Sequence, residues 1–217
     1  RMKMTTLIQR VLKFKLEIQG GLPSSSYESI DAIARSAVAA KPNLAKHVGP
    51  EGVVTLLFSD IENSTPLTQQ MGDEGWLEIL NAHNELIRTE VTRGGGQVVK
   101  TQGDGFMVAF SSARSALRSA IAIQKEMQER DLRAGDVPIR VRIGLHTGEL
   151  VRVEGDFFGR HVNLASRVAS QAKGGQILVS SLTRELVAGS PDFVFSDPWE
   201  VDLKGVSETQ RLVELKW

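Results

Sequence analysis

Apolar and polar positions alternate along most of the chain in two spacings, one typical of strands and the other of helices. From Val53 a continuous apolar run reaches Asp60 and predicts a buried strand. Helix-capping residues follow at Asn63, and a helix is expected from there to the glycines at 94–96. Two β-prone runs within 97–110 then flank a Gly-Asp-Gly turn, which predicts a β-hairpin because glycine tolerates positive φ.

The pattern continues with a broad apolar face over 113–130, which predicts a second helix, and with an alternating strand within 137–147. The resulting order is the ferredoxin-like βαββαβ arrangement of an α+β fold, in which the helices pack on one face of an antiparallel sheet. C-terminal additions are expected as a strand at 150–153, a helix at 161–172, a strand at 176–180, a short helix at 182–188 and a strand pair at 193–203 and 210–216.

The N-terminal residues follow a different pattern and predict a mostly helical extension, 1–50, before a main domain, 51–217. Apolar side chains at positions 7, 11, 14 and 18 are spaced as in a narrow helical seam, although 12–18 also alternates as a strand would. Residues 27–40 predict another short helix. The chain begins with Arg1 rather than methionine, which is typical of a processed end or of one that had sequence upstream.

Composition excludes several classes of function. The chain has 217 residues, with 26 Lys and Arg against 26 Asp and Glu, so its overall charge indicates neither nucleic acid nor an anionic membrane as a partner. It has no cysteine, which excludes disulfides and thiolate metal sites. Because no apolar run approaches the roughly 18 to 20 residues that cross a bilayer, we expect a soluble, cytoplasmic protein without membrane insertion.

Two acidic residues stand where strands end. Asp60 closes the first predicted strand, and Asp104 occupies the tip of the predicted hairpin. An Asp-Gly turn alone usually does no more than connect strands. Two carboxylates at the ends of neighbouring strands can, however, bind a divalent metal ion.

The predicted helix at 161–172 has two distinct sides. At about 100° per residue its alanines and Val168 gather on one side, whereas Asn163 and Arg167 lie one turn apart on the other. A solvated helix surface is the ordinary interpretation of such a pair. The alternative is an amide and a guanidinium directed together at phosphate, which arginine binds well through its planar, permanently charged fork.

Four motifs resemble those of a known family. They are FSDIENST at 58–65, KTQGDG at 100–105, DFFG at 156–159 and VNLASR at 162–167. In this order and with compatible gaps, they resemble the catalytic domain of class III nucleotide cyclases, specifically adenylyl cyclases of bacterial type, over 51–217. The extension at 1–50 would then be regulatory or would extend a dimer.

The resemblance implies a metal site made by Asp60, Asp104 and the backbone carbonyl of Ile61. Two divalent cations, Mg²⁺ or Mn²⁺, would activate the ribose 3′-hydroxyl and hold the phosphates of the substrate. The backbone amides of Asn63, Ser64 and Thr65 would open a helix and bind phosphate there. The family often has glycine and an aromatic residue at positions 63 and 64, which this chain replaces.

The resemblance also implies how the nucleotide is recognised. Lys100 and Asp156 resemble the pair that selects adenine, by donating to N1 and accepting from N6. Asn163 would orient the ribose and Arg167 would stabilise charge on the α-phosphate. Lys204 resembles the lysine that binds the triphosphate.

The activity implied is an adenylate cyclase that converts ATP to 3′,5′-cyclic AMP and pyrophosphate, as a homodimer with two shared active sites. Arg152 is a further candidate for phosphate binding. The alternatives are a guanylyl cyclase and a catalytically inactive nucleotide-sensing dimerisation module. A diguanylate cyclase is disfavoured because its Gly-Gly-Asp/Glu-Glu-Phe signature is absent.

Overall fold

The computed structural model describes residues 26–40, 52–149 and 156–217. Three sequence-based predictions lie outside these residues: the helical seam at 7–18, the strand at 150–153 and the phosphate role of Arg152. The helix predicted at 27–40 is present as α2, Ser26–Ala40. None of the described helices is long and apolar enough to span a bilayer.

The sheet is organised around β1, the strand that ends near Asp60. Four strands of the sheet lie side by side in the order β2, β3, β1, β6, and all of their pairings are antiparallel. Helix α3 connects β1 to β2, and α4 leads from β3 towards β6. The βαββαβ core is therefore confirmed. Its elements are β1 (Val53–Ile61), α3 (Ser64–Arg93), β2 (Gln97–Gln102), β3 (Gly105–Phe110), α4 (Ala113–Arg130) and β6 (Val141–Glu149).

The C-terminal additions extend the same sheet beyond β6. The strand β7 pairs with β6 in parallel, and β10 pairs antiparallel with β7, β8 and β9. Helix α5 precedes β7 and a short helix follows it. The bounds are α5 (Asp156–Gln171), β7 (Ile177–Ser180), α6 (Ser181–Glu185), β8 (Val194–Phe195), β9 (Trp199–Val201) and β10 (Gln210–Lys216).

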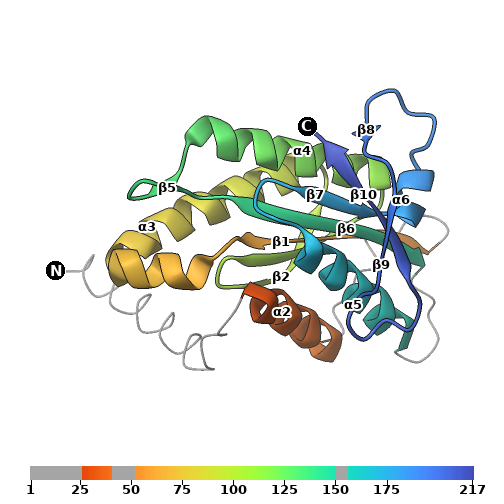
Figure 1. Ribbon diagram of the computed structural model, residues 1–217, viewed down its shortest axis with the longest axis horizontal. Coiled ribbons are helices and arrows are strands. Elements are labelled where there is room, and N and C mark those ends of the chain that lie inside the picture. Colours follow the sequence, from red (N-terminus) through yellow and green to blue (C-terminus); the bar gives the residue numbers. More distant parts are fainter. Residues whose placement is uncertain (1–25, 41–51, 150–155) are drawn as a thin grey trace.

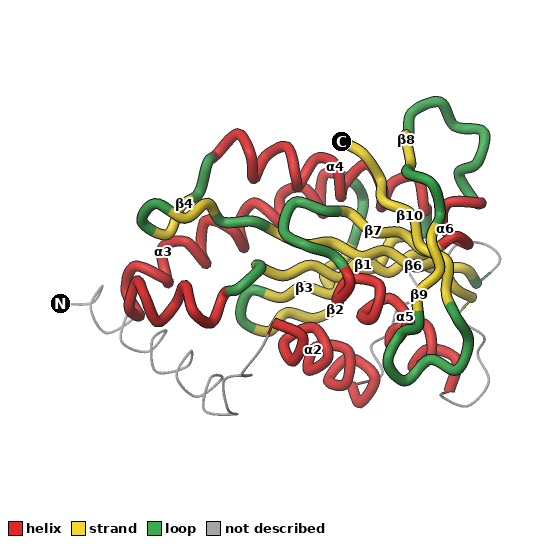
Figure 2. The backbone as a smooth tube through the Cα atoms, viewed as in Figure 1, coloured by secondary structure: helices red, strands yellow, loops and turns green. Residues whose placement is uncertain are grey.

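Helices cover both faces of the sheet, not one face as the ferredoxin-like pattern alone predicts. Figures 1 and 2 show α3 and α4 on one side of the sheet and α2 and α5 on the other. Strand β1 serves both layers because its side chains alternate: Leu57 and Ile61 join the core with α3 and α4, whereas Leu56 and Phe58 join the core with α2 and α5. The second layer forms because the added α5 and the N-terminal α2 have apolar sides of their own.

Several elements differ from those predicted, among them the strand expected at 193–203, which is two short strands, β8 and β9. The strand expected from residue 137 begins at Val141, because Val137–Pro138 (β5) pairs with Arg133–Ala134 (β4) in a separate two-stranded ribbon. Helix α3 bends at Gly72, whose φ of 72° is not helical. Helix α5 begins at Asp156, five residues before the predicted start at 161.

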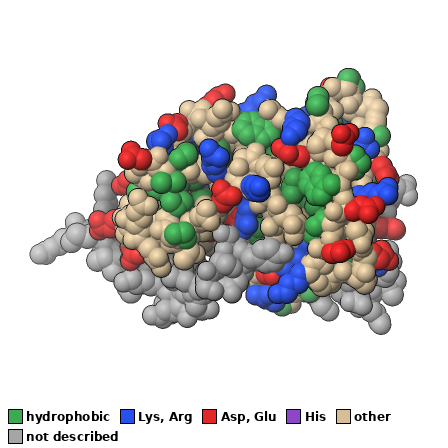
Figure 3. Space-filling model, viewed as in Figure 1, with side chains coloured by type: hydrophobic (Ala, Val, Ile, Leu, Met, Phe, Trp, Pro, Cys, Tyr) green, Lys and Arg blue, Asp and Glu red, His purple; other side chains and the backbone are tan. Residues whose placement is uncertain are grey.

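The described surface carries both signs of charge, as the equal numbers of acidic and basic residues predict. Figure 3 shows Lys and Arg side chains interspersed with Asp and Glu over the face it presents. The distribution of charge therefore does not locate the functional site, which depends on the arrangement of individual side chains.

Candidate active site

Asp60 lies near the end of β1 on the face that α2 and α5 cover. It shares this face with Leu56 and Phe58 because side chains two residues apart point the same way along a strand. Its carboxylate is fully buried and forms a two-pronged ion pair with Arg142 of β6, which stands directly opposite in the sheet register. The second of these bonds joins Nη2 of Arg142 to Oδ2 of Asp60 at 2.8 Å.

Asp104 is brought to the same place by the β2–β3 turn. Its Oδ2 accepts a hydrogen bond from the backbone N–H of Ile61 at 2.9 Å. Burial, and after it the negative charge of Asp60, raises the pKa of Asp104 to about 7. The three residues predicted to form the metal site, Asp60, Ile61 and Asp104, are therefore neighbours in the fold.

The donor set fits a divalent cation of the Mg²⁺ or Mn²⁺ type. Carboxylate and carbonyl oxygens are the ligands these ions prefer, and two like charges buried together are stabilised by an added positive charge. In this structure the guanidinium of Arg142 provides that charge. Within the described ranges no three His, Cys, Asp or Glu side chains gather as a metal site, so a cation here would also need the Ile61 carbonyl.

The start of α3 lies against this pair of carboxylates. Asn63 precedes the helix with φ 56° and ψ 32°, in the left-handed region, and its side chain makes no capping hydrogen bond. Asparagine tolerates this region better than most residues other than glycine. Asn63 therefore adopts a backbone conformation that also suits glycine, the residue expected here from the resemblance. The next residue, Ser64, donates a side-chain hydrogen bond to Asp104.

A second group of predicted site residues gathers around a cavity of about 300 Å³ beside α5. Asn163 and Arg167 reach it from α5, and Lys204 reaches it from the exposed turn between β9 and β10. Helix α2 completes the lining with Asp31 and Arg35, among others. Neither Asp60 nor Asp104 lines this cavity.

The sequence places Asn163 and Arg167 there because the other side of α5 is held tightly against the sheet. Val168 and the alanines of that side are buried, as predicted. A Cβ added at Gly144 of β6 would lie only 2.2 Å from the backbone of Ala169, so the helix and strand backbones approach closely. Arg167 is only partly exposed, however: its Nη1 contacts both carboxylate oxygens of Asp31, at 2.7 and 2.6 Å.

Lys100 and Asp156 were predicted to read the base. Lys100 stands opposite Met107 in the β2–β3 register, which places it on the face that α2 covers, and it is half-buried. A bulge interrupts β2 between Val98 and Lys100. Asp156 is the first residue of α5, and its side chain lies outside the described part of the structure.

Sequence reasoning missed Arg142 and Asp31. Arg142 has a detectable signal, because it is a charge in a strand whose other positions from Val141 to Gly148 are also buried. Burial lowers its pKa, but the hydrogen bonds and charge of Asp60 raise it, and the net shift is upward. Asp31 gives no such signal, since its partner lies 136 residues away.

A histidine pair also joins α5 to the sheet. Nε2 of His146 lies 3.0 Å from Nδ1 of His161, and the rings stack with centroids 5.2 Å apart. Burial lowers the pKa of His146 to about 3 and also lowers that of His161. Both rings are therefore neutral near pH 7, as expected for a packing role.

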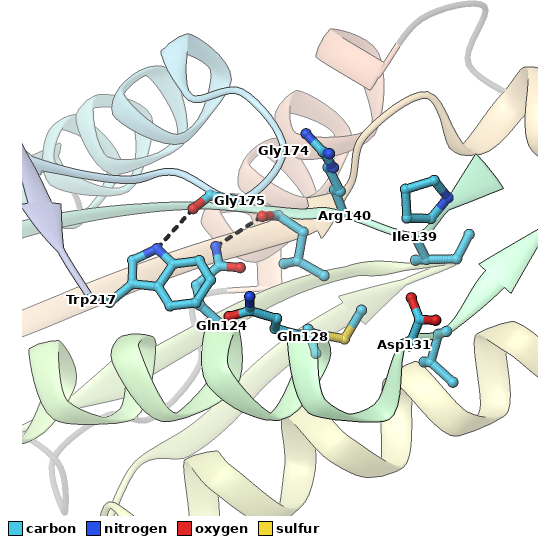
Figure 4. Close-up of a pocket in the computed structure, with 12 residues that line it drawn as sticks. Gln124, Gln128, Asp131, Ile139, Arg140, Gly174, Gly175 and Trp217 are labelled. Atoms are coloured by element: carbon cyan, nitrogen blue, oxygen red, sulfur yellow. Dashed lines mark hydrogen bonds between the residues drawn. The ribbon is translucent and has the colours of Figure 1, made fainter.

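A separate cavity of about 310 Å³ opens between α4 and the end of the sheet (Figure 4). Two hydrogen bonds hold its wall: Trp217 donates to the carbonyl of Gly175, and Gln124 to that of Val141, each at 2.9 Å. Of the described residues predicted for the site, none lines this cavity. We therefore assign no part of the candidate site to it.

Comparisons with known proteins identify the family of this chain. The sequence profile of the adenylate and guanylate cyclase catalytic domain matches residues 47–215. An uncharacterised protein of Mycobacterium tuberculosis is 36% identical over 155 residues, which cover 71% of this chain and 50% of that protein. The adenylate cyclase of Mycosarcoma maydis is 32% identical over 195 residues, which cover 74% of this chain and 8% of that enzyme. This chain thus spans half or less of the length of these relatives.

A solved structure shows the same fold. The adenylyl cyclase CyaB of P. aeruginosa matches with a TM-score of 0.65 at 27% identity, over 76% of this chain and 93% of that one. The profile match covers most of this chain. The order of strands and helices is also the one implied by the four sequence motifs of this chain. The chain belongs to the class III adenylate and guanylate cyclase family.

Proposed function

We propose that this chain is an adenylate cyclase, which converts ATP to 3′,5′-cyclic AMP and pyrophosphate. The observation that carries the proposal is the meeting of Asp60 and Asp104 beside the backbone of Ile61. Two buried carboxylates that repel each other make little contribution to a stable core, but they suit a site for divalent cations. This arrangement favours a catalyst over a nucleotide-sensing module.

In the proposed reaction the ribose 3′-oxygen attacks the α-phosphorus, the bond from that phosphorus to the β-phosphate oxygen breaks, and pyrophosphate leaves. The hydroxyl proton passes to water. Bound Mg²⁺ or Mn²⁺ would lower the pKa of the 3′-hydroxyl and offset the charge of the phosphates. Asp60 and Asp104 would hold these cations, and the amides at the start of α3 would bind phosphate.

The remaining residues would act on the other parts of the nucleotide. Asn163 would orient the ribose, and Arg167 would stabilise the charge that develops on the α-phosphate. Lys204, on the same cavity, would bind the triphosphate.

Lys100 and Asp156 support ATP as the substrate. A lysine donor matches N1 of adenine and a carboxylate acceptor matches its N6 amine, whereas guanine reverses both patterns and would leave polar groups unpaired. The family includes guanylate cyclases, so a guanylyl cyclase is the alternative. Identification of the cyclic nucleotide that forms distinguishes the two activities.

We also propose that the active form is a homodimer with two shared sites. Asp60 and Asp104 form one group, and Asn163, Arg167 and Lys204 line a cavity that includes neither aspartate. In a two-fold dimer the first group of one chain can face the second group of its partner. A reaction that needs both groups would then require two chains.

The test is incubation of the purified chain with ATP or GTP in the presence of Mg²⁺ or Mn²⁺, followed by identification of the product. We expect cyclic AMP. The variant Lys100→Glu/Asp156→Gly should lower the ratio of kcat/KM for ATP to that for GTP, whereas Lys125→Glu, an exposed change on α4, should not. Conversion of GTP alone would indicate a guanylyl cyclase, and conversion of neither would indicate a sensing module.

A further inference from the structure

Helix α2 lies across the sheet face that carries the candidate site. Its buried side packs on β1, β3 and α5 through Ile30, Ile33, Ala34 and Ala37. The contact is closest at the β2–β3 turn, where a Cβ added to Gly105 would lie 2.2 Å from Cδ1 of Ile33. No further element can enter between α2 and the turn that holds Asp104.

The same helix neutralises the arginine proposed to act on the α-phosphate. Asp31 presents both carboxylate oxygens to Arg167, and both side chains are largely shielded from water, at 15% and 18% exposure. A carboxylate and a phosphate make the same kind of charge-assisted hydrogen bond to a guanidinium. Asp31 therefore occupies the position at Arg167 that a substrate phosphate would need.

Helix α2 is also separable from the main core. Among the described residues, the core between the sheet and helices α3 and α4 includes none from α2. That core spans β1, β3 and β6, so its contacts with the sheet do not involve α2. Release of α2 would uncover Phe58, Met107 and their apolar neighbours, together with the charged site residues on the same face.

We propose that α2 is an inhibitory cap, which withholds Arg167 from substrate and covers the face on which a second copy of this chain docks. The inference rests on the proposed function, because it assigns Arg167 to the substrate phosphate and the active state to a dimer. We assign a second copy of this chain to the docking face because one chain alone does not gather both groups of site residues around one cavity. Release of α2 would then make both Arg167 and the docking face accessible at the same time.

An engineered disulfide tests the proposal in the full-length chain. The chain has no cysteine, so Val38→Cys/Gly159→Cys introduces a single thiol pair. A Cβ at Gly159 would lie 3.5 Å from Cγ1 of Val38, a position that Sγ of a cysteine can take, so the two cysteine side chains are near enough to be joined. Oxidation locks α2 to α5 and reduction releases it, so one sample provides both states.

Two quantities are compared in the oxidised and reduced states: the molar mass by sedimentation over a range of protein concentrations, and the rate of cyclic nucleotide formation. We expect the oxidised chain to remain a monomer and its turnover to fall about tenfold or more, because only chains that release α2 can dock. An oxidised chain that dimerises and turns over like the reduced one would overturn the proposal.

A second variant covers the case in which both states remain monomers. Ile33→Glu places a charge against the sheet and should expel α2, which gives a dimer and raised turnover. Ala39→Glu, an exposed change on the same helix, is the matched control and should behave as the parent chain. If Ile33→Glu stays monomeric or loses its folded sheet, α2 is a permanent part of the fold and the proposal fails.

The two proposals can fail separately. If no form of the chain converts ATP or GTP, the proposed function is wrong. The mass measurements still decide whether α2 blocks docking, because they do not depend on catalysis.

Discussion

Asn63 illustrates how a residue other than glycine can adopt a left-handed backbone conformation. The chain reverses direction between β1 and α3, and position 63 takes a positive φ of 56°. Glycine adopts this region without cost, and asparagine does so with less strain than most residues. The turn can therefore still deliver Ser64 to Asp104.

At Asp104 we predict that Asp104→Asn keeps the fold and removes the response to metal. The substitution preserves size and removes one of two like charges in a buried site. Turnover should fall about a hundredfold or more, and Mn²⁺ should no longer raise Tm, because a ligand of the cation is lost. Calorimetry with and without Mn²⁺ measures this, and Asp73→Asn, exposed on α3, serves as the control. A rise in Tm of parental size in Asp104→Asn would refute the metal assignment.

His83 provides a prediction about pH. It is fully buried on α3 with its ring 5.9 Å from that of Phe106, and burial lowers its pKa from 6.5 to about 4. Below pH 6.5 His83 is protonated in the unfolded chain but stays neutral in the folded chain. Stability is thus fully present above pH 6.5 and declines as pH falls towards 4.

The variant His83→Leu should remove about 3 kcal/mol of this decline, since one pKa unit corresponds to about 1.4 kcal/mol. Urea unfolding midpoints between about pH 7.5 and 4.5 provide the measurement. Asn81→Ala, an exposed and non-titrating change on the same helix, should leave the pH dependence as it is. Parallel curves for His83→Leu and the parent chain would contradict the prediction.

At this scale the sequence predicts acidic site residues better than their partners. Asp60 and Asp104 stand out because each ends a strand, which local pattern reveals. Arg142 lies inside a strand and Asp31 on a separate helix, and each acts through a residue far away in the chain. Such pairs depend on sheet register and on helix packing, which periodicity does not specify.

Among the elements, α5 packs closely on β6 near the site. The sequence predicts which side of α5 is buried, because its alanines and valine follow helical spacing. It does not predict the start of the helix at Asp156, since Gly159 and the aromatic pair before it favour a loop. Nor does it show that Val137 and Pro138 leave β6 for a separate ribbon.

We predict that Gly144→Ala destabilises the fold by about 1–3 kcal/mol, because the added methyl meets the backbone of α5 rather than a flexible side chain. Its Cβ would lie 2.2 Å from Ala169. The matched control is Gly75→Ala within α3, where the nearest atom is the mobile end of Met71 at 3.2 Å. The control should be about 0.5–1 kcal/mol more stable than the parent. Equal urea midpoints for the two variants would argue against the close approach.

At the scale of the whole molecule, the sequence predicts the order of strands but not the position of α2. Strand order follows from the βαββαβ pattern and its short connections. The docking of α2 depends on apolar side chains that could pack on several surfaces, and on an ion pair across most of the chain. Only the assembled fold shows that this helix meets the site.

The proposed homodimer with shared sites leads to a prediction about mixed dimers. Asp104→Asn and Arg167→Ala should each be nearly inactive alone, but in a mixed dimer both lesions fall in one shared site and leave the other intact. Random equal mixing makes about half of the dimers mixed, so activity should return to roughly a quarter of the parental level. Co-expression followed by an assay of cyclic AMP measures this. Activity that stays at the level of the single variants, with mixed dimers verified by mass, would exclude shared sites.

The pairing of β1 with β6 has a consequence for quality control of the protein. Asp60 meets Arg142 only in the observed register, because a slip of one residue along β1 would turn Asp60 towards α3 and α4 and send Leu57 and Ile61 to the opposite face. The apolar alternation that keeps the sheet in register therefore also selects the face on which the carboxylate stands. A preparation containing chains in a wrong register would lose activity in proportion to their number, so specific activity would report how faithfully the sheet has folded.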